Sequence, residues 1–281
     1  MMTRIKTVLL MITLMFCAWP VQAEIDSKLF KEFKLGYSPL DIELSLSGQR
    51  VFVLDDQGHL RIYNMAGDLT DTITVGKHVD KIKVSSRDDL LFLSSRDTKT
   101  LQILSLTYTH NIDISGSPYQ GPSNAPVAVV VFSDFQCPYC AKIRAIIDQV
   151  RGHYAKEVKS VFKHFPLPSH KFALHAAKAS IAADAQGKFW QFHDQLFENY
   201  SQIDEKKIEE IRTALNLDKT KFEKVMEAPQ TLEKITKDRQ EGEQAEVRGT
   251  PTVFVNGRMV RPANYENIKE AVEAALKGLK K

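Results

Sequence analysis

The feature that most constrains this chain is a pair of cysteines between a strand pattern and a helix pattern. Residues 127–132 form a nearly continuous apolar run, which is typical of a strand buried on both faces. Cys137-Pro138-Tyr139-Cys140 follows, and apolar residues then recur at helical spacing up to Tyr154. Pro138 takes the first helical position, where its missing N–H costs nothing. The sequence therefore predicts a Cys-x-x-Cys motif at the N-terminus of a helix that leaves a buried strand.

This position predicts distinct roles for the two cysteines. A thiol at a helix N-terminus faces unpaired backbone N–H groups and the positive end of the helix dipole, so we expect the pKa of Cys137 to be lowered. The thiolate is the form that attacks a disulfide. Cys140 lies one turn later on the same helix face and can reach the Cys137 sulfur. We predict that Cys137 attacks and that Cys140 resolves the mixed disulfide.

A Cys-x-x-Cys motif is also a common half of a zinc site. A structural zinc site takes four ligands, usually from two such pairs or from Cys and His pairs, and the sequence contains no second cysteine pair. Four histidines lie in the region expected to be a helical insertion, without clear ligand spacing: His164, His170, His175 and His193. We therefore expect neither a metal nor another cofactor.

Residues 1–23 have the pattern of a secretory signal peptide. A positively charged end precedes an apolar stretch over residues 8–19, and Val21-Gln22-Ala23 precedes the expected cleavage point. A membrane anchor is the alternative, but the apolar stretch is shorter than the roughly 20 residues that span a bilayer. Cleavage would remove Cys17 and leave only the Cys-x-x-Cys pair. We expect a protein that is periplasmic or otherwise exported, and soluble after cleavage.

Residues 24–110 have a different pattern, with short alternating segments separated by turn residues. Strands are expected at 51–54, 60–63, 90–93 and 101–104. The segment around Leu46 has a counterpart around Val84, about 38 residues later, which is close to one β-propeller blade. Two blades cannot close a ring, so we predict a small antiparallel β module with propeller-like repeats. Because its edge strands would expose unpaired backbone groups, we expect it to pack on the rest of the chain or to pair in a homodimer.

Residues 111–125 are predicted to be a linker, after which residues 126–281 have the pattern of an α/β domain. The first strand and helix are followed by a strand at 158–165, a long helical region and a hairpin marked by Asn256-Gly257. A last amphipathic helix begins near Asn264. This order of β, α, β, helical insertion, β-hairpin and α predicts a thioredoxin fold with a helical insertion.

Several blocks of this domain resemble the DsbA family of thiol:disulfide oxidoreductases, over about residues 116–280. The blocks are 121–126, 129–140, Phe165-Pro166-Leu167-Pro168-Ser169-His170, Gln186-Gly187-Lys188-Phe189-Trp190 and Gly249-Thr250-Pro251. The resemblance implies that the Thr250–Pro251 peptide bond is cis and lies beside the Cys-x-x-Cys motif. Thr250 can then offer its main-chain groups to an extended substrate segment. The predicted substrate-binding residues are Pro138, Tyr139, Thr250 and Pro251.

One position departs from the family pattern. Many thioredoxin and DsbA relatives have a buried acid six positions before the first cysteine, and this chain has Val131 there. Asp134 is the nearest acid before Cys137, and it fits a strand-end cap as well as a proton acceptor. The chain resembles the disulfide isomerases DsbC and DsbG in three features. They are the missing acid at position 131, Pro138-Tyr139 between the cysteines and Thr250 before the proline.

The predicted function is that of an exported enzyme, a protein thiol:disulfide oxidoreductase that mainly oxidises its substrates. A stabilised thiolate favours the reduced enzyme and makes the oxidised enzyme an oxidant. Two alternatives stay open: a disulfide isomerase or reductase of the DsbC or DsbG type, and a binding module whose cysteine pair only senses redox state. Expected partners are unfolded or misoxidised exported proteins and a membrane redox protein that resets the cysteine pair. With 38 basic and 35 acidic residues, nucleic acid is not expected as a partner.

Overall fold

The computed structural model describes residues 26–29, 31–86 and 89–279, and the predicted signal peptide lies outside them. By compactness the chain divides into residues 1–38 and 39–281. The described residues of the first unit contain no helix or strand, and the elements given below all belong to the second. None of the helices in the described ranges combines the length and the hydropathy that a membrane-spanning helix requires.

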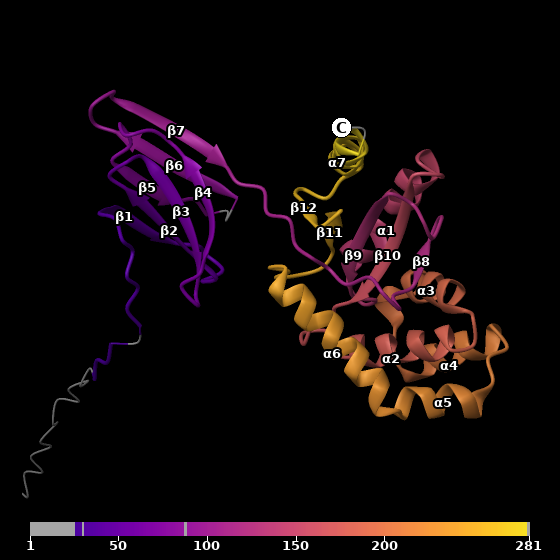
Figure 1. Ribbon diagram of the computed structural model, residues 1–281. Helices are drawn as coiled ribbons and strands as arrows, with labels where there is room; N and C mark the ends of the chain where they lie inside the picture. The colour runs from indigo at the N-terminus through magenta and orange to yellow at the C-terminus, as the bar shows by residue number, and fades with distance from the viewer. Residues whose placement is uncertain (1–25, 30, 87–88, 280–281) are drawn as a thin grey trace, which may run out of the picture. The chain divides into compact units, whose positions relative to one another are not determined.

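The N-terminal half of the second unit consists of two antiparallel sheets (Figure 1). The first sheet has the order β1 (Pro39–Leu44), β2 (Arg50–Asp55), β3 (His59–Asn64) and β4 (Leu69–Thr74), and the second has the order β5 (Lys81–Val84), β6 (Leu90–Ser95) and β7 (Thr100–Ser105). The four predicted strands correspond to β2, β3, β6 and β7. Small antiparallel sheets are therefore present, whereas the resemblance to propeller blades stays a prediction.

One apolar core joins these two sheets. Phe52 and Leu54 of β2 are buried in the same cluster as Leu91 and Leu93 of β6. Alternate residues of each strand point to one face, so this pairing follows from the alternating pattern of the sequence. The core explains why two sheets of only three and four strands are stable together.

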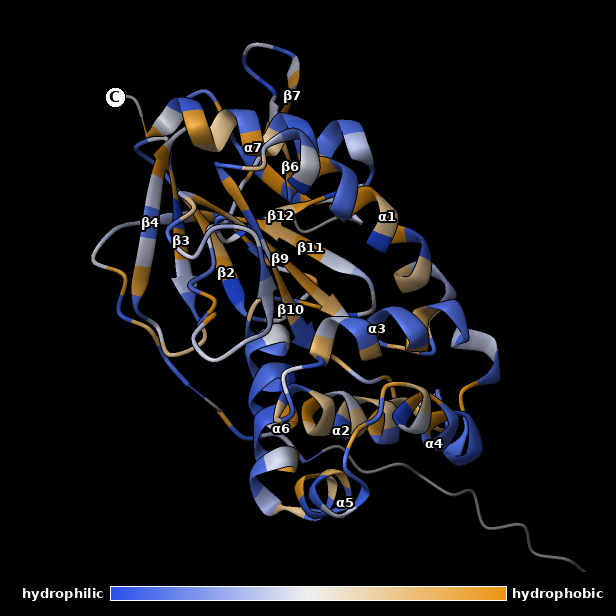
Figure 2. Ribbon diagram, turned by 90° about the vertical axis from the view of Figure 1, so that its right-hand side faces the viewer, coloured by the Kyte–Doolittle hydropathy of each residue, from blue (hydrophilic) through white to orange (hydrophobic). Residues whose placement is uncertain are grey.

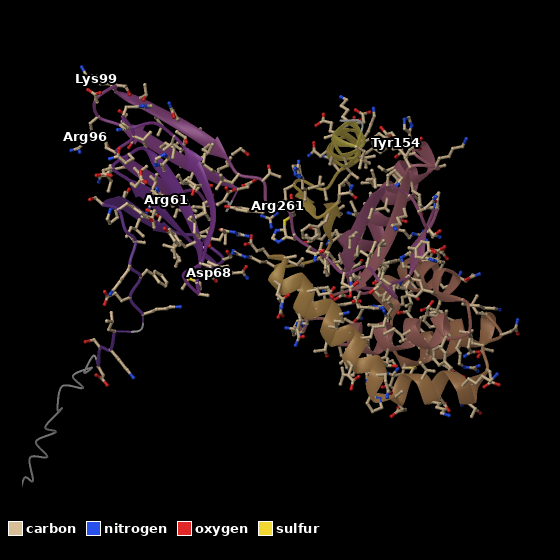
Figure 3. The ribbon with its side chains drawn as sticks, viewed as in Figure 1. Arg61, Asp68, Arg96, Lys99, Tyr154 and Arg261 are labelled. Carbon is tan, nitrogen blue, oxygen red and sulfur yellow. The ribbon has the colours of Figure 1, made fainter. Side chains whose placement is uncertain are left out.

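A buried carboxylate fixes the turn between β2 and β3. Asp55 accepts hydrogen bonds from the backbone N–H groups of Gln57 and His59, at 3.0 and 2.8 Å. Arg61, which is labelled in Figure 3, donates its Nε–H to the same carboxylate at 3.0 Å. The charge of Asp55 is thus paired although its side chain is fully buried.

A five-stranded sheet forms the centre of the C-terminal region. Its order is β12 (Arg258–Val260), β11 (Thr252–Val255), β9 (Val127–Ser133), β10 (Val158–His164) and β8 (Tyr119–Gln120). β9 pairs parallel with β10 and antiparallel with β11. The two-residue β8 lies within the predicted linker. The sequence did not predict this strand, because two residues are too few to give a periodic signal.

Seven α-helices and one 3-10 turn accompany this sheet in the described residues. They are α1 (Pro138–His153), α2 (Ala173–Asp184), α3 (Phe189–Glu198), η1 (Tyr200–Gln202), α4 (Glu205–Ala214), α5 (Lys219–Glu227), α6 (Pro229–Gln244) and α7 (Tyr265–Gly278). The long helical region predicted after the strand at 158–165 is divided into separate helices, of which the first two are α2 and α3. The chain turns between them at Gly187, whose φ of +71° suits glycine. The α/β thioredoxin fold with a helical insertion is confirmed.

Strand β9 is covered on both faces, as its apolar run predicts. Val129 and Val131 pack in a cluster with residues of α1 and α7, whereas Val130 and Phe132 pack on the opposite face with Phe254. Figure 2 shows the apolar residues concentrated along β9 and β11. Helix α1 therefore begins just after the end of a strand that is buried on both faces.

A hydrogen bond joins the end of α1 to the middle of α7. Tyr154 follows α1 and is labelled in Figure 3, and its hydroxyl donates to Glu273 of α7 at 2.9 Å. Burial and this carboxylate raise the pKa of Tyr154 to about 12. The phenol is therefore a constant hydrogen-bond donor at neutral pH.

The hairpin between β11 and β12 has the predicted turn. Asn256 and Gly257 both have positive φ values, 44° and 79°, which a two-residue type I′ turn requires. The backbone N–H of His110 donates to the Gly257 carbonyl at 2.8 Å. The segment before β8 is thus attached to the turn of this hairpin.

Candidate active site

The cysteine pair lies where the segment after β9 meets α1. Cys137 is the N-cap residue, with φ and ψ of −78° and 120°, and Pro138 occupies the first turn. The backbone N–H groups of Cys140 and Ala141 donate to the Cys137 carbonyl at 3.0 and 3.2 Å. The first turn of this fully described helix has no acidic residue, so no carboxylate there opposes a negative charge on the sulfur.

The surroundings of Cys137 favour its thiolate. The largest contribution is a hydrogen bond from the Cys140 side chain, which burial opposes, and Thr250 and the backbone N–H groups of Cys140 and Tyr139 add to it. Together they lower the pKa of Cys137 to about 5 from an ordinary value of 9.0. In its thiol form, Cys137 donates to the Thr250 carbonyl oxygen, with 3.3 Å between Sγ and O.

Cys140 has the opposite environment. Its side chain belongs to the buried core and the residue is 1% exposed. Burial raises the pKa of Cys140, and the hydrogen bond with Cys137 raises it further, whereas a hydrogen bond with Ser133 acts in the other direction. At neutral pH the pair therefore consists of one thiolate and one thiol, and the thiol hydrogen-bonds to the thiolate.

The loop before β11 completes the site. The Thr250–Pro251 peptide bond is cis, as predicted. Thr252 pairs with Phe132 near the end of β9, and this register brings the loop to the cysteine pair. Tyr139, between the cysteines, is 66% exposed. Cys137, Tyr139 and the Thr250 main chain are thus close together, while the binding roles of Pro138, Tyr139, Thr250 and Pro251 stay predictions.

Asp134 anchors the loops around the site. Its fully buried carboxylate accepts hydrogen bonds from the backbone N–H of Gln136 at 2.7 Å, from that of Leu167 at 2.8 Å and from His170 Nδ1 at 2.8 Å. Its carbonyl accepts from the backbone N–H of Cys137 at 3.1 Å. Asp134 thus links the segment before α1 to the loop after β10, which fits a structural role.

Sequence reasoning did not place two polar residues, Ser133 and His193, beside Cys140. Ser133 lies on the same face of β9 as Val131, and strand alternation could have indicated it. His193 lies among the buried apolar residues of α3, beside Phe192 and Leu196, and it is 5% exposed. The only sign of His193 in the sequence was a polar residue among the apolar residues of a predicted helix. Cys140, Ser133, Val131 and His193 line one cavity.

The other histidines have separate environments. His170 is bound to Asp134, and His164 packs between aromatic rings, with 5.1 Å between its ring centroid and that of Phe162. Within the described ranges, no group of three or more His, Cys, Asp or Glu side chains could hold a metal ion.

Comparisons with known proteins agree with this geometry. The family model Thioredoxin_4, described as thioredoxin, matches residues 114–274. The oxidised structure of BdbD from Bacillus subtilis is 27% identical, with a TM-score of 0.54 over 61% of this chain and 99% of that chain. A thioredoxin-like oxidoreductase from Silicibacter pomeroyi is 26% identical, with a TM-score of 0.53 over 58% of this chain and 94% of that chain.

A curated relative is much longer than this chain. The Na(+)/H(+) antiporter NhaA 1 of Mycolicibacterium vanbaalenii is 33% identical over 159 residues, which are 55% of this chain and 26% of the antiporter. The chain thus spans about a quarter of the length of that relative. The family match, in contrast, extends over more than half of this chain and includes Cys137 and Cys140. The chain belongs to the Thioredoxin_4 family and has the thioredoxin fold.

Proposed function

We propose that this chain is an exported enzyme that transfers disulfides to protein substrates through Cys137 and Cys140, mainly as an oxidant. The observation that carries the proposal is the lowered pKa of Cys137 beside a thiol whose pKa is raised. A thiolate that is stable at neutral pH stabilises the reduced enzyme, so the oxidised enzyme gives up its disulfide readily.

The surroundings of Cys137 support a polypeptide substrate. The Thr250 carbonyl lies 3.3 Å from the Cys137 sulfur, where it could pair with the backbone of an extended segment. The exposed ring of Tyr139 offers an apolar contact beside it. Unfolded exported proteins present both features, which fits them as substrates.

Export and resetting of the cysteine pair are part of the same proposal. A signal peptide over residues 1–23 would deliver the chain to a compartment where disulfides persist. Each turnover as an oxidant leaves the pair reduced, so a membrane redox partner has to reoxidise it. The mass of the protein recovered from the cell envelope tests the first point, with cleavage after Ala23 as the expected result.

The direct test is the reduction potential, measured by equilibration with glutathione. Reference values run from about −270 mV for thioredoxin to about −120 mV for DsbA. We expect a value above about −200 mV, together with rapid oxidation of reduced ribonuclease. A potential near that of thioredoxin would contradict the oxidant role.

Isomerase or reductase activity is a second candidate, favoured by Val131 at the position of the buried acid. Recovery of scrambled ribonuclease and reduction of insulin, measured beside oxidation of reduced ribonuclease, separate the three directions. A passive redox sensor would show none of the three activities, and Cys137→Ser would preserve its function in the cell.

A further inference from the structure

A small cavity lies directly beside Cys140. Its wall is formed by residues of β9, β10, α1 and α3, including Val131, Ser133, Cys140, Phe162, Trp190 and His193. About 40 Å³ is open to the centres of water-sized molecules. One water needs roughly 10–15 Å³ by this measure, and it needs polar partners, which Ser133 and His193 provide.

Cys140 has to lose and regain a proton in every exchange reaction, although burial raises its pKa. Ser133 is a hydroxyl and cannot act as a base at neutral pH, and Val131 is apolar. The other titratable residues on the cavity wall are Arg144, Asp148 and His193. Arginine stays protonated in proteins, and Asp148 is about half exposed and paired with Arg151 at 2.8 Å. Of these three groups, His193 is therefore the one suited to exchange a proton inside the cavity.

The hydrogen bonds of His193 leave one ring nitrogen available as a base. Its Nδ1 lies 2.9 Å from Oδ1 of Asp194, and Arg144 binds the same oxygen at 2.8 Å. A carboxylate only accepts hydrogen bonds, so Nδ1 carries the proton and Nε2 carries the lone pair. Burial lowers the pKa of His193, which keeps the ring neutral at pH 7.

The charged groups that face His193 come from three elements. Asp194 belongs to α3, Arg144 and Asp148 belong to α1, and His164 belongs to β10. Asp194 stabilises the protonated ring, whereas Arg144 opposes it. The ring can thus hold a proton for a short time and release it again.

We propose that His193 exchanges the proton of Cys140 through water in this cavity, with Asp194 fixing the orientation of the ring. The proposal rests on the disulfide exchange described under the proposed function. When a mixed disulfide joins Cys137 to a substrate, the Cys140 S–H proton passes through water to His193 Nε2. The Cys140 thiolate then attacks the Cys137 sulfur, and the bond between Cys137 and the substrate sulfur breaks. The electron pair leaves with the substrate sulfur, which takes up a proton from solvent.

In the oxidising direction the same groups act in reverse. A substrate thiolate attacks Cys137 in the oxidised enzyme, and Cys140 leaves as a thiolate with the electron pair of the broken bond. The protonated His193 then returns a proton to Cys140 through the water. One group therefore serves both directions, as microscopic reversibility requires.

The test follows the two steps separately. The reduced mature protein, which lacks Cys17, is mixed with glutathione disulfide, quenched in acid at short times and alkylated, and the Cys137–glutathione mixed disulfide is quantified by mass. In His193→Gln, we expect this species to form at the wild-type rate and to decay at least tenfold more slowly. In the wild type, the decay rate of the mixed disulfide should rise with pH and level off once His193 has lost its proton, below pH 6.5. In His193→Gln, the decay rate should keep rising with pH.

His164→Gln is the matched control. His164 is also buried and also packs on Phe162, but it is not among the residues that line the cavity. Unchanged decay in His193→Gln, or equal slowing in both variants, overturns the proposal. If His193→Gln does not fold by circular dichroism, Asp194→Ala removes the acceptor that orients the ring, at a half-exposed position, and the decay of the mixed disulfide should again slow. Absence of any mixed disulfide in the wild type instead overturns disulfide exchange itself, which keeps the two failures distinct.

Discussion

The sulfur of Cys137 lies 3.3 Å from the main-chain oxygen of Thr250, although 113 residues separate the two in the sequence. The register of β11 on β9 produces this proximity, because Thr252 pairs with Phe132. The sulfur of Cys137 is thus placed beside the backbone of the loop that precedes β11. The chemistry of the site depends on this neighbourhood and on the burial of Cys140.

The stability of the reduced protein should rise with pH relative to that of the oxidised protein. The folded state lowers the pKa of Cys137 from 9.0 to about 5, so between these values the unfolded chain binds one more proton than the folded chain. The stabilisation is complete near pH 9, where the unfolded thiol ionises, and it is lost as pH falls toward 5. Urea unfolding of both redox forms across this range measures it. Reduced Cys137→Ala serves as the control, and a slope equal to that of the control would contradict the prediction.

Asp134→Asn should destabilise the protein by about 2 kcal/mol, because an amide oxygen cannot replace two buried carboxylate oxygens that accept three N–H groups. Urea unfolding measures the change. Asp148→Asn is the control, since its carboxylate is half exposed and pairs with Arg151, and it should cost less than about 1 kcal/mol. Equal effects of the two substitutions would show that Asp134 is not an anchor.

A buried ion pair joins β10 to α6. Lys163 Nζ lies 2.8 Å from Asp238 and 2.7 Å from Glu241, and the Lys163 side chain is 2% exposed. Lys163→Met should cost about 3–5 kcal/mol, because it leaves two carboxylates without their cation. Lys237→Met removes an ammonium that is 60% exposed, and it should cost less than about 1 kcal/mol. Thermal unfolding compares the two variants, and a loss below about 1 kcal/mol for Lys163→Met would refute the prediction.

The edge strand β7 should mediate a homodimer. Leu101 and Ile103 on this strand are 68% and 62% exposed, and an exposed apolar edge is a ready site for pairing with a second copy. Light scattering of the mature protein should give the mass of a dimer, and Leu101→Lys with Ile103→Lys should give that of a monomer. Deletion of residues 24–110 should have the same effect. A monomeric wild type would exclude the dimer.

Local patterns were sufficient to predict the central elements. The apolar run of β9, the helical spacing of α1 and the Asn256-Gly257 turn each occupy consecutive residues, and each has one structural interpretation. The cis bond at Pro251 was predicted only through resemblance, because no local pattern distinguishes it from other prolines.

Side-chain contacts between segments that lie far apart in the sequence could not be predicted in this way. The bond between Asp134 and His170 spans 36 residues, and that between Lys163 and Asp238 spans 75. Such pairs depend on how loops and helices pack, and a single sequence does not encode their partners in any periodic signal. The position of His193 beside Cys140 was not predicted for the same reason, since only the assembled cavity brings the two residues together.

We expect Cys137 to be a thiolate at neutral pH, because Cys140 and the helix N-terminus stabilise it. The rate of alkylation of Cys137 in the reduced protein, followed by mass from pH 4 to pH 10, measures this most directly. We predict a midpoint near pH 5, and a higher midpoint in Cys140→Ala, which lacks the strongest hydrogen bond to the sulfur. A wild-type midpoint near pH 9, the value of an ordinary thiol, would show that the fold does not stabilise the Cys137 thiolate.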